Sequence, residues 1–403
     1  PAIMGLNSTP SAERLHIGIF GKRNAGKSSV INAITGQDLA IVSDVKGTTT
    51  DPVYKAMELL PLGPVVLIDT PGLDDEGELG AMRVRKSYQV LNKTDIALVI
   101  ADASDGAGAE ENALIARIRA KGIPYLLVYN KSDRGTGAPL PPDAIAVSAK
   151  TGENIHALKE RIGALIPQGG NGKRIVGDLL SPSDVVVLVV PVDAAAPKGR
   201  LILPQQQPIR AILDASAIAV VSKETELSDT LAALARPPRM VITDSQAFGV
   251  VSKLVPREIP LTSFSILFAR YKGNLAAAVR GAKAVDSLRD GDAVLICEGC
   301  THHRQCGDIG TQKLPAWIRQ HTGVSPAFSF TSGGDFPDDL AGYRLIVHCG
   351  GCTLNEREMQ YRLKCAADAG VPMTNYGTMI AYIHGVLARS VAPFADVAAI
   401  LAR

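Results

Sequence analysis

A glycine-rich loop near the N-terminus constrains the fold more than any other feature of the sequence. The apolar residues 15–20 lead into Gly21-Lys-Arg-Asn-Ala-Gly-Lys-Ser28, and a helical pattern follows. This spacing between a strand and a helix is typical of a phosphate-binding P-loop. Its glycines let backbone N–H groups face phosphate oxygens, and the positive end of the helix dipole adds to the attraction. We expect Lys27 to reach the β- and γ-phosphates and Ser28 to ligate Mg²⁺.

Two further motifs supply groups for the same metal and phosphates. Residues 65–69 form a predicted strand that ends in Asp69-Thr-Pro-Gly72. The Asp69 carboxylate would hold Mg²⁺ through water, and the Gly72 N–H would contact the γ-phosphate. The hydroxyl-rich segment 46–51 lies between this motif and the P-loop, and its Thr49 is the expected second magnesium ligand.

The last two motifs predict a guanine pocket. Asn130-Lys-Ser-Asp133 follows an apolar strand, and its carboxylate can accept two hydrogen bonds from guanine that adenine does not offer. Ser148-Ala-Lys150 completes the pocket. All five motifs stand in order, so this part of the chain resembles a translation-factor-type GTPase domain that binds GTP and GDP. The expected nucleotide contacts are Gly21, Asn24, Ala25, Gly26, Lys27, Ser28, Ser29, Thr49, Asp69, Gly72, Asn130, Lys131, Asp133, Ser148, Ala149 and Lys150. Lys27, Asn24, Thr49 and Gly72 are the expected catalytic residues.

Two positions predict how hydrolysis is assisted. Leu73 stands where Ras-like enzymes carry the Gln that orients the attacking water, so the site alone should be slow. Asn24 in Asn-Ala-Gly-Lys-Ser-Ser resembles the potassium-activated GTPases of tRNA modification and ribosome assembly. That resemblance implies a K⁺ ion beside the phosphates, held by Asn24, where it would supply transition-state charge.

Composition limits the other functions that need to be considered. The formal net charge is +2, and no basic excess favours a nucleic-acid partner. No apolar run is long enough to cross a membrane. The six Cys all lie at or after Cys297, which favours a metal site in a reducing compartment over a disulfide framework, so we expect a cytoplasmic protein.

The sequence divides into three predicted α/β domains and a linker. The domains are a GTP-binding domain at 1–167, a middle domain at 175–265 and a metal-cluster domain at 266–403, and the linker is at 168–174. The middle domain has a continuous apolar run at 184–192 and no catalytic constellation. We therefore expect it to form a two-fold homodimer in which the apolar strands near residues 185–190 complete a sheet or pack across the axis.

Two loops in the last domain carry metal-ligand residues. Glu298-Gly-Cys-Thr-His-His303 follows the predicted strand 293–297, and His348-Cys-Gly-Gly-Cys352 follows the predicted strand 344–347. Open α/β sheets bind ligands at the carboxyl ends of their strands. Thiolates and imidazoles suit an iron–sulfur cluster, zinc or copper(I), so a zinc site with two Cys and two His remains an alternative.

The pattern Cys-x-His…His-Cys-x-x-Cys, behind a GTPase domain and a small middle domain, resembles the HydF family of [FeFe]-hydrogenase maturation GTPases. The resemblance implies a [4Fe-4S] cluster on Cys300, Cys349 and Cys352. Its fourth iron would be open or weakly held, with His302, His303, His348 and Asp308 as candidates.

The same resemblance implies a scaffold that carries a transient diiron precursor. The radical-SAM maturases HydE and HydG would contribute to the precursor, and apo-[FeFe]-hydrogenase would receive it. Two alternatives remain: an iron–sulfur enzyme whose open iron acts as a Lewis acid, and a GTPase of RNA modification or ribosome assembly with a structural metal domain.

Overall fold

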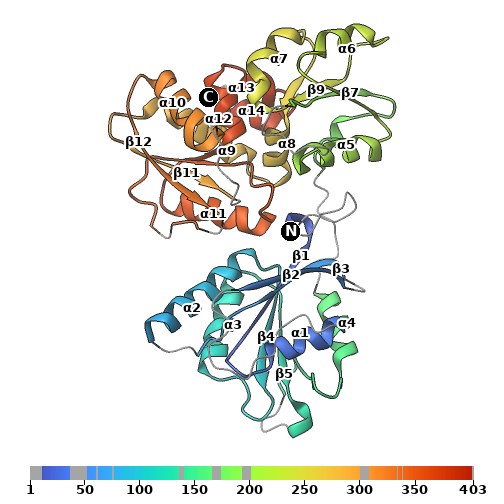
Figure 1. Cartoon of the computed structure of the whole chain (residues 1–403), viewed down its shortest axis with the longest axis vertical. Helices are drawn as coiled ribbons and strands as arrows, with labels where there is room; N and C mark the ends of the chain where they lie inside the picture. The colour runs from blue at the N-terminus through green and yellow to red at the C-terminus, as the bar shows by residue number, and fades with distance from the viewer. Residues whose placement is uncertain are drawn as a thin grey trace. The chain divides into compact units, whose positions relative to one another are not determined.

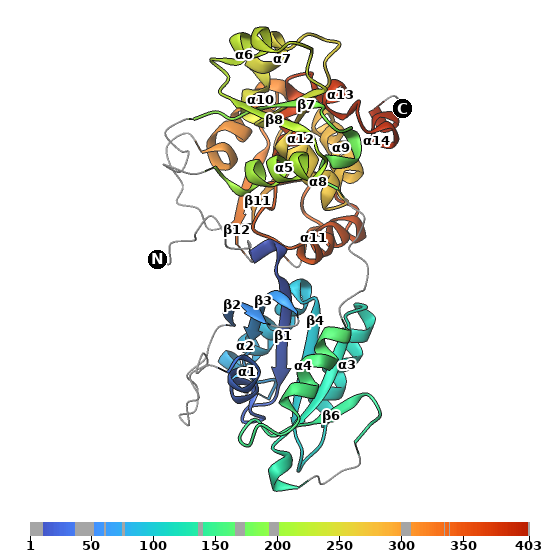
Figure 2. The same ribbon diagram turned by 90° about the vertical axis from the view of Figure 1, so that its right-hand side faces the viewer.

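The computed structural model forms two compact units, residues 1–170 and 171–403. It describes residues 11–36, 52–59, 62–74, 77–135, 140–165, 174–192, 201–299, 308–333, 335–337 and 339–401. Both units are α/β, as predicted, and their helices and strands are labelled in Figures 1 and 2. No helix in the described part of the chain combines the length and the apolar character that crossing a bilayer requires.

The first unit is built on a six-stranded sheet in the order β2-β3-β1-β4-β5-β6. Only the edge pair β2–β3 is antiparallel, and the remaining neighbours are parallel. The strands are β1 (Leu15–Gly21), β2 (Val53–Leu59), β3 (Gly63–Asp69), β4 (Ile96–Asp102), β5 (Tyr125–Asn130) and β6 (Ala144–Ala146). The helices are α1 (Lys27–Thr35), α2 (Gly77–Val90), α3 (Ala109–Ala120) and α4 (Ile155–Ala164), with short turns η1 (Ser11–Glu13), η2 (Leu91–Lys93) and η3 (Ser132–Arg134).

Helices cover both faces of this sheet. One apolar core joins β1, β3 and β4 to buried residues of α1 and α4, such as Ile31 and Leu158. A second core joins the other face to α2 and α3 through Val90 and Leu114. Alternate residues of the buried strands serve the two cores, which is why the strands read as continuous apolar runs. The carboxyl ends of β1, β3 and β5 therefore meet at one edge, where the nucleotide motifs lie.

The second unit contains two four-stranded parallel sheets. The first has the order β10-β9-β7-β8 and the second β12-β11-β13-β14. Their strands are β7 (Val185–Val189), β8 (Ile218–Ser222), β9 (Met240–Thr243), β10 (Leu261–Ser263), β11 (Ala293–Glu298), β12 (Ala327–Ser332), β13 (Leu345–His348) and β14 (Met373–Asn375). The α-helices are α5 (Leu203–Asp214), α6 (Leu227–Ala233), α7 (Phe248–Leu254), α8 (Phe264–Tyr271), α9 (Leu275–Lys283), α10 (Leu314–Thr322), α11 (Glu356–Asp368), α12 (Tyr376–Ile383), α13 (Leu387–Val391) and α14 (Ala395–Leu401). Shorter turns are η4 (Gly177–Leu179), η5 (Ser245–Ala247), η6 (Ala284–Ser287) and the π-helical η7 (Ile309–Lys313).

Residues on both sides of the predicted boundary at 265 share one core. Val187 and Ile242 of the first sheet belong to the same apolar cluster as Leu267 of α8, Val279 of α9 and Val391 of α13. The C-terminal helices therefore pack onto the middle sheet, and the contacts do not divide the second unit at residue 265. The boundary at 265 stays a prediction.

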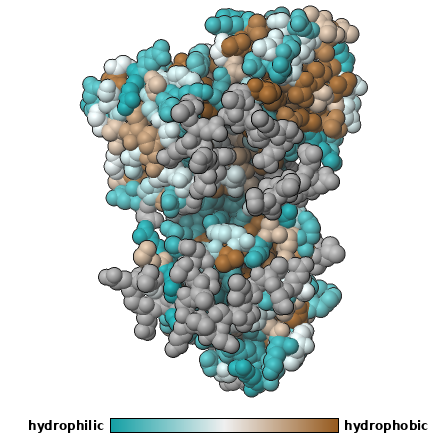
Figure 3. All heavy atoms as spheres, in the orientation of Figure 1, coloured by the Kyte–Doolittle hydropathy of each residue, from teal (hydrophilic) through white to brown (hydrophobic). Residues whose placement is uncertain are grey.

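Within the group of apolar strands expected at a subunit interface, the strand of residues 185–189 itself is not exposed. β7 is an inner strand between β9 and β8, and the side chains of residues 186–189 are 0% exposed. The edge strand β8 instead exposes Ile218 and Val221, each at 48%. Figure 3 shows brown, apolar surface at the upper right, where Figure 1 places β7 and its neighbours.

Candidate functional site

The P-loop lies between β1 and α1, as predicted. Gly26 has φ 89°, in the left-handed region that favours glycine, and a Cβ there would come within 2.2 Å of the Asn130 amide nitrogen. The Lys27 ammonium donates to the carbonyls of Gly21 at 3.0 Å and Lys22 at 2.9 Å. It thus lies across the loop whose N–H groups would face the phosphates, in position to meet their charge.

The predicted magnesium ligands Ser28 and Asp69 are adjacent. The Ser28 hydroxyl donates to Asp69 Oδ2 at 2.8 Å. Asp69 Oδ1 is buried without a hydrogen-bond partner, and burial raises the pKa of this carboxyl against the opposing effect of Ser28. A buried carboxylate oxygen without a partner is costly unless a cation or donor meets it, so the pair fits Mg²⁺. Thr49 lies outside the described residues.

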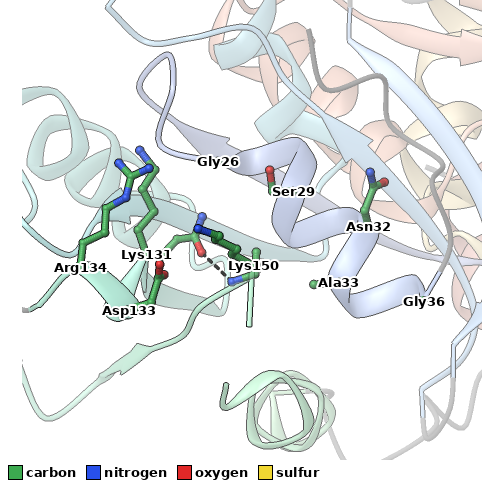
Figure 4. Close-up of a pocket in the computed structure, with 11 residues that line it drawn as sticks. Gly26, Ser29, Asn32, Ala33, Gly36, Lys131, Asp133, Arg134 and Lys150 are labelled. Carbon is green, nitrogen blue, oxygen red and sulfur yellow. Dashed lines mark hydrogen bonds between the residues drawn. The ribbon is translucent and has the colours of Figure 1, made fainter. Parts of the chain in front are cut away.

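A cavity of about 590 Å³ lies where the guanine pocket was expected. Figure 4 shows it between α1 and the loops that carry Lys131, Asp133 and Lys150. Its lining comprises Gly26, Ser29, Asn32, Ala33, Gly36, Asn130, Lys131, Asp133, Arg134, Ala149 and Lys150.

Hydrogen bonds join the loops around this cavity. Asn130 is buried, donates to Ala25 O at 3.1 Å and accepts from Ala149 N at 3.1 Å, so it ties the P-loop to the base-binding loops. The Ser148 hydroxyl donates to the Asp133 carboxylate at 2.7 Å and holds its pKa below the ordinary value. Asp133 is therefore an ionised acceptor at neutral pH, as guanine recognition requires.

The side chain of Leu73, which follows Gly72, does not point toward the phosphate site. Leu73 is only 7% exposed and packs in the core between the sheet and α3. Asp74 instead accepts a 2.6 Å hydrogen bond from the P-loop N–H of Arg23. Asn24 has φ 62°, a conformation that asparagine tolerates well, and this accounts for the residue type without reference to an ion.

The two strands that lead into the cysteine loops are neighbours in one sheet, as predicted. β11 and β13 pair in parallel with Cys297 opposite His348. Gly299 N and Gly351 N point at Cys349 Sγ, at 3.0 and 3.4 Å, and the Thr353 hydroxyl donates to Gly299 O at 3.0 Å. Backbone N–H groups directed at a sulfur suit a thiolate, which accepts hydrogen bonds more strongly than a thiol.

The described residues fit a thiolate-held metal, although they do not include the whole predicted ligand set. Cys349 and Cys352 lie in one loop, and burial raises the pKa of Cys352, reinforced by the charge of Cys349. A bound metal would offset the cost of burial and the repulsion between the two sulfurs, because its positive charge stabilises the deprotonated form. Cys300, His302 and His303 lie outside the described residues, and within those described no three His, Cys, Asp or Glu form a metal-binding group.

The two described candidates for a fourth ligand differ in their surroundings. His348 is 0% exposed, and both ring nitrogens are engaged: Nδ1 lies 2.8 Å from Cys349 O and Nε2 lies 3.0 Å from an Arg362 nitrogen. Asp308 begins η7, where one carboxylate oxygen accepts from Thr311 N at 2.8 Å and from its hydroxyl at 2.9 Å. An aspartate with one capping oxygen still has a second oxygen for a metal.

Three residues beside the cysteine loops were not singled out from the sequence. They are Lys272 at the end of α8 and the ion pair Glu358–Arg362 within α11. The pair has i,i+4 spacing and lies beside the buried Met359 and Ala366. A charged pair that overlaps the apolar face of a helix could have indicated from the sequence that these charges are buried. The sequence offered no comparable signal for Lys272.

Family models match three separate stretches of the chain. The Hydrogen maturase F dimerization domain matches residues 175–273, and the Hydrogen maturase F tetramerization domain matches residues 276–393. A 50S ribosome-binding GTPase model matches residues 16–131. Together with the P-loop, the Asp69 motif and the two base-binding motifs that the structure describes, this match makes the N-terminal unit a P-loop GTPase domain.

Individual relatives match over part of the chain. The tRNA modification GTPase MnmE of Thiobacillus denitrificans is 35% identical over 152 residues, 37% of this chain and 33% of that protein. MnmE of Xanthomonas euvesicatoria is 41% identical over 154 residues, 38% and 34% of the two chains. The chain thus spans about a third of the length of these relatives. Among solved structures, Aquifex aeolicus Era gives a TM-score of 0.35 at 20% identity, with 52% of this chain and 93% of that chain covered.

Proposed function

The chain belongs to the hydrogen maturase F family, and from this premise we propose that it is a GTPase scaffold for hydrogenase maturation. In this proposal it binds a [4Fe-4S] cluster, helps assemble the diiron precursor and transfers that precursor to apo-[FeFe]-hydrogenase. HydE and HydG supply the precursor's components. The observation that carries the proposal is the pairing of strands β11 and β13, with the Gly299 and Gly351 N–H groups directed at Cys349 Sγ.

Cys349 and Cys352, with Cys300, would hold the cluster, whose chemistry is to present an iron for an exchangeable ligand. His302, His303 and Asp308 are the proposed sources of the weak fourth ligand. An oxygen or imidazole ligand exchanges more readily than a protein thiolate, which suits a site that must accept and release cargo. The protein's own contribution is to hold the sulfurs and donate N–H groups to them.

The GTPase domain would act as a switch. Ser28 and Asp69 would hold Mg²⁺, Lys27 would neutralise the phosphates, and Asp133 would select guanine. Neither Leu73 nor Asn24 places a water-orienting group at the phosphates in the way a Gln would, so K⁺ at Asn24 is proposed to supply the missing charge.

Self-association is proposed to use the edge of the middle sheet. β8 exposes apolar side chains and leaves one row of backbone N–H and C=O groups outside the described sheet. An exposed apolar edge strand is a template for pairing with a second copy. A homodimer through β8 would cover it.

Infrared spectroscopy tests the cargo directly. Protein co-expressed with HydE and HydG should show bands of metal-bound CO and CN⁻, and the bands should disappear in Cys349→Ser. Cys365→Ser is the matched control, because Cys365 lies in α11 outside the motif. Wild-type protein that contains an intact cluster but shows no such bands would contradict the scaffold function.

A further inference from the structure

A buried lysine holds the second cysteine loop from one side. Lys272 follows α8 and is 5% exposed. Its ammonium donates to Leu354 O at 2.9 Å and also to Gly351 O. Both carbonyls belong to the loop that carries Cys349 and Cys352. Burying an ammonium group costs free energy unless hydrogen-bond partners compensate it, and here the two loop carbonyls are those partners.

A buried arginine contacts the histidine that directly precedes this loop. Arg362 is 0% exposed, pairs with Glu358 at 2.9 Å and donates to Gly333 O at 2.9 Å. Its third contact is His348 Nε2 at 3.0 Å. Because a guanidinium can only donate, Nε2 must be the acceptor, and Nδ1 then carries the proton and donates to Cys349 O at 2.8 Å.

The helix that carries Arg362 is itself fixed. Asn355 caps α11 by accepting from Glu358 N at 3.0 Å, and the Gln360 amide donates to Lys272 O at 2.6 Å. In Figure 1, α11 lies beside the sheet that contains β11. The two cations are therefore tied to each other through α11 as well as to the loop.

We propose that Lys272 and Arg362 form a cationic clamp that presets the Cys349–Cys352 loop, Lys272 through the loop carbonyls and Arg362 through His348, and that His348 is a positioning residue of this clamp and not an iron ligand. The inference rests on the function proposed above, since it assigns the clamp to a thiolate-held cluster. The charges suit this role. The Arg362–Glu358 pair is neutral overall, while the Lys272 charge lies beside cysteines whose thiols lose their protons when they bind metal.

The clamp can be tested first in metal-free protein. Hydrogen exchange measured by mass spectrometry should show faster exchange of the 349–354 amides in Lys272→Met and His348→Gln, by about tenfold or more, because hydrogen bonds to charged groups are lost. Lys364→Met is the control. Lys364 lies on the exposed face of α11, the helix that carries Arg362, so this variant should leave the exchange unchanged. Arg362→Gln should speed exchange of the same amides, because it removes the partner of His348. Peptides from β7 report on folding of the unit, and Arg362→Lys replaces Arg362→Gln if that variant loosens the whole unit.

The loaded protein gives the second test. After anaerobic reconstitution, Lys272→Met should lose iron to a chelator about 10- to 100-fold faster than wild type. Pulsed EPR of the reduced cluster in wild type and His348→Gln should show the same ¹⁴N coupling. Unchanged loop exchange would overturn the clamp, and loss of a strong histidine coupling in His348→Gln would overturn the assignment of His348. Faster loop exchange in a protein that takes up no iron would support the clamp and overturn the scaffold function instead.

Discussion

At the scale of single residues, recognition depends on which lone pairs and charges are held in place. Asp133 is fixed by Ser148, and Asn130 by Ala25 and Ala149, so the base-binding groups need little reorganisation when guanine enters. Fixed partners reduce the entropy that binding must otherwise remove.

Asp133→Asn should weaken GTP binding by about 10- to 150-fold, since hydrogen bonds to a charged acceptor are lost. It should improve binding of xanthosine triphosphate, whose base presents an acceptor to the new amide. Fluorescent-nucleotide titration measures both affinities, with Asp143→Asn in an exposed loop as the control. An unchanged preference for GTP would show that Asp133 does not read the base.

Potassium activation belongs to the same scale. GTP turnover of the wild type should be faster in KCl than in equimolar NaCl, and Asn24→Ala should remove most of the difference, because the amide oxygen is the proposed ligand. Equal rates in the two salts would exclude a potassium site, and Asn24 would then serve only the left-handed turn of the loop.

At the scale of elements, inner and edge strands have different roles. β7 is enclosed by β8 and β9, so its apolar residues build the domain core, whereas β8 presents apolar side chains outward. Both strands read as β-branched and apolar in the sequence, and only their order in the sheet separates them.

Val221→Asp should therefore weaken self-association by about tenfold or more, because a charge would be buried at the proposed contact. Light scattering across a dilution series gives the mass at each concentration. Met82→Asp, at an apolar residue that is 60% exposed on α2 in the other unit, is the control. A dimer equally stable in Val221→Asp would place the interface away from β8.

At the scale of the whole molecule, the nucleotide motifs and the described cysteine loop belong to different compact units. Each unit has its own apolar cores, so a defect at one site need not unfold the other. Communication between GTP and cluster would then be a coupling between two separately folded parts.

Lys27→Ala and Ser28→Ala should abolish GTP hydrolysis and leave iron and sulfide content at the wild-type level. The reason is that the phosphate ligands and the cysteines lie in separate units. Phosphate release and metal analysis of reconstituted protein measure the two effects. A large loss of iron in both variants would show that the units assemble their sites together.

Motifs whose residues are neighbours along the chain could be predicted from the sequence. The P-loop, the guanine motif and the loops after residues 293–297 and 344–347 were all predictable, because strand, turn and ligand residues are neighbours in sequence. Parallel strands then bring their carboxyl ends to one edge, so the meeting of Gly299 with Cys349 followed from pattern alone.

The burial of charged side chains and the position of a strand at a sheet edge depend on packing between distant segments, so they could not be predicted from the sequence. Lys272 is separated from Gly351 by 79 residues, and nothing in its neighbours predicts their contact. His348 was a candidate ligand from its motif, yet its ring nitrogens are occupied by Cys349 and by Arg362, 14 positions along the chain. Burial and hydrogen-bond partners come from packing between elements, whereas a sequence pattern records only the order within each one.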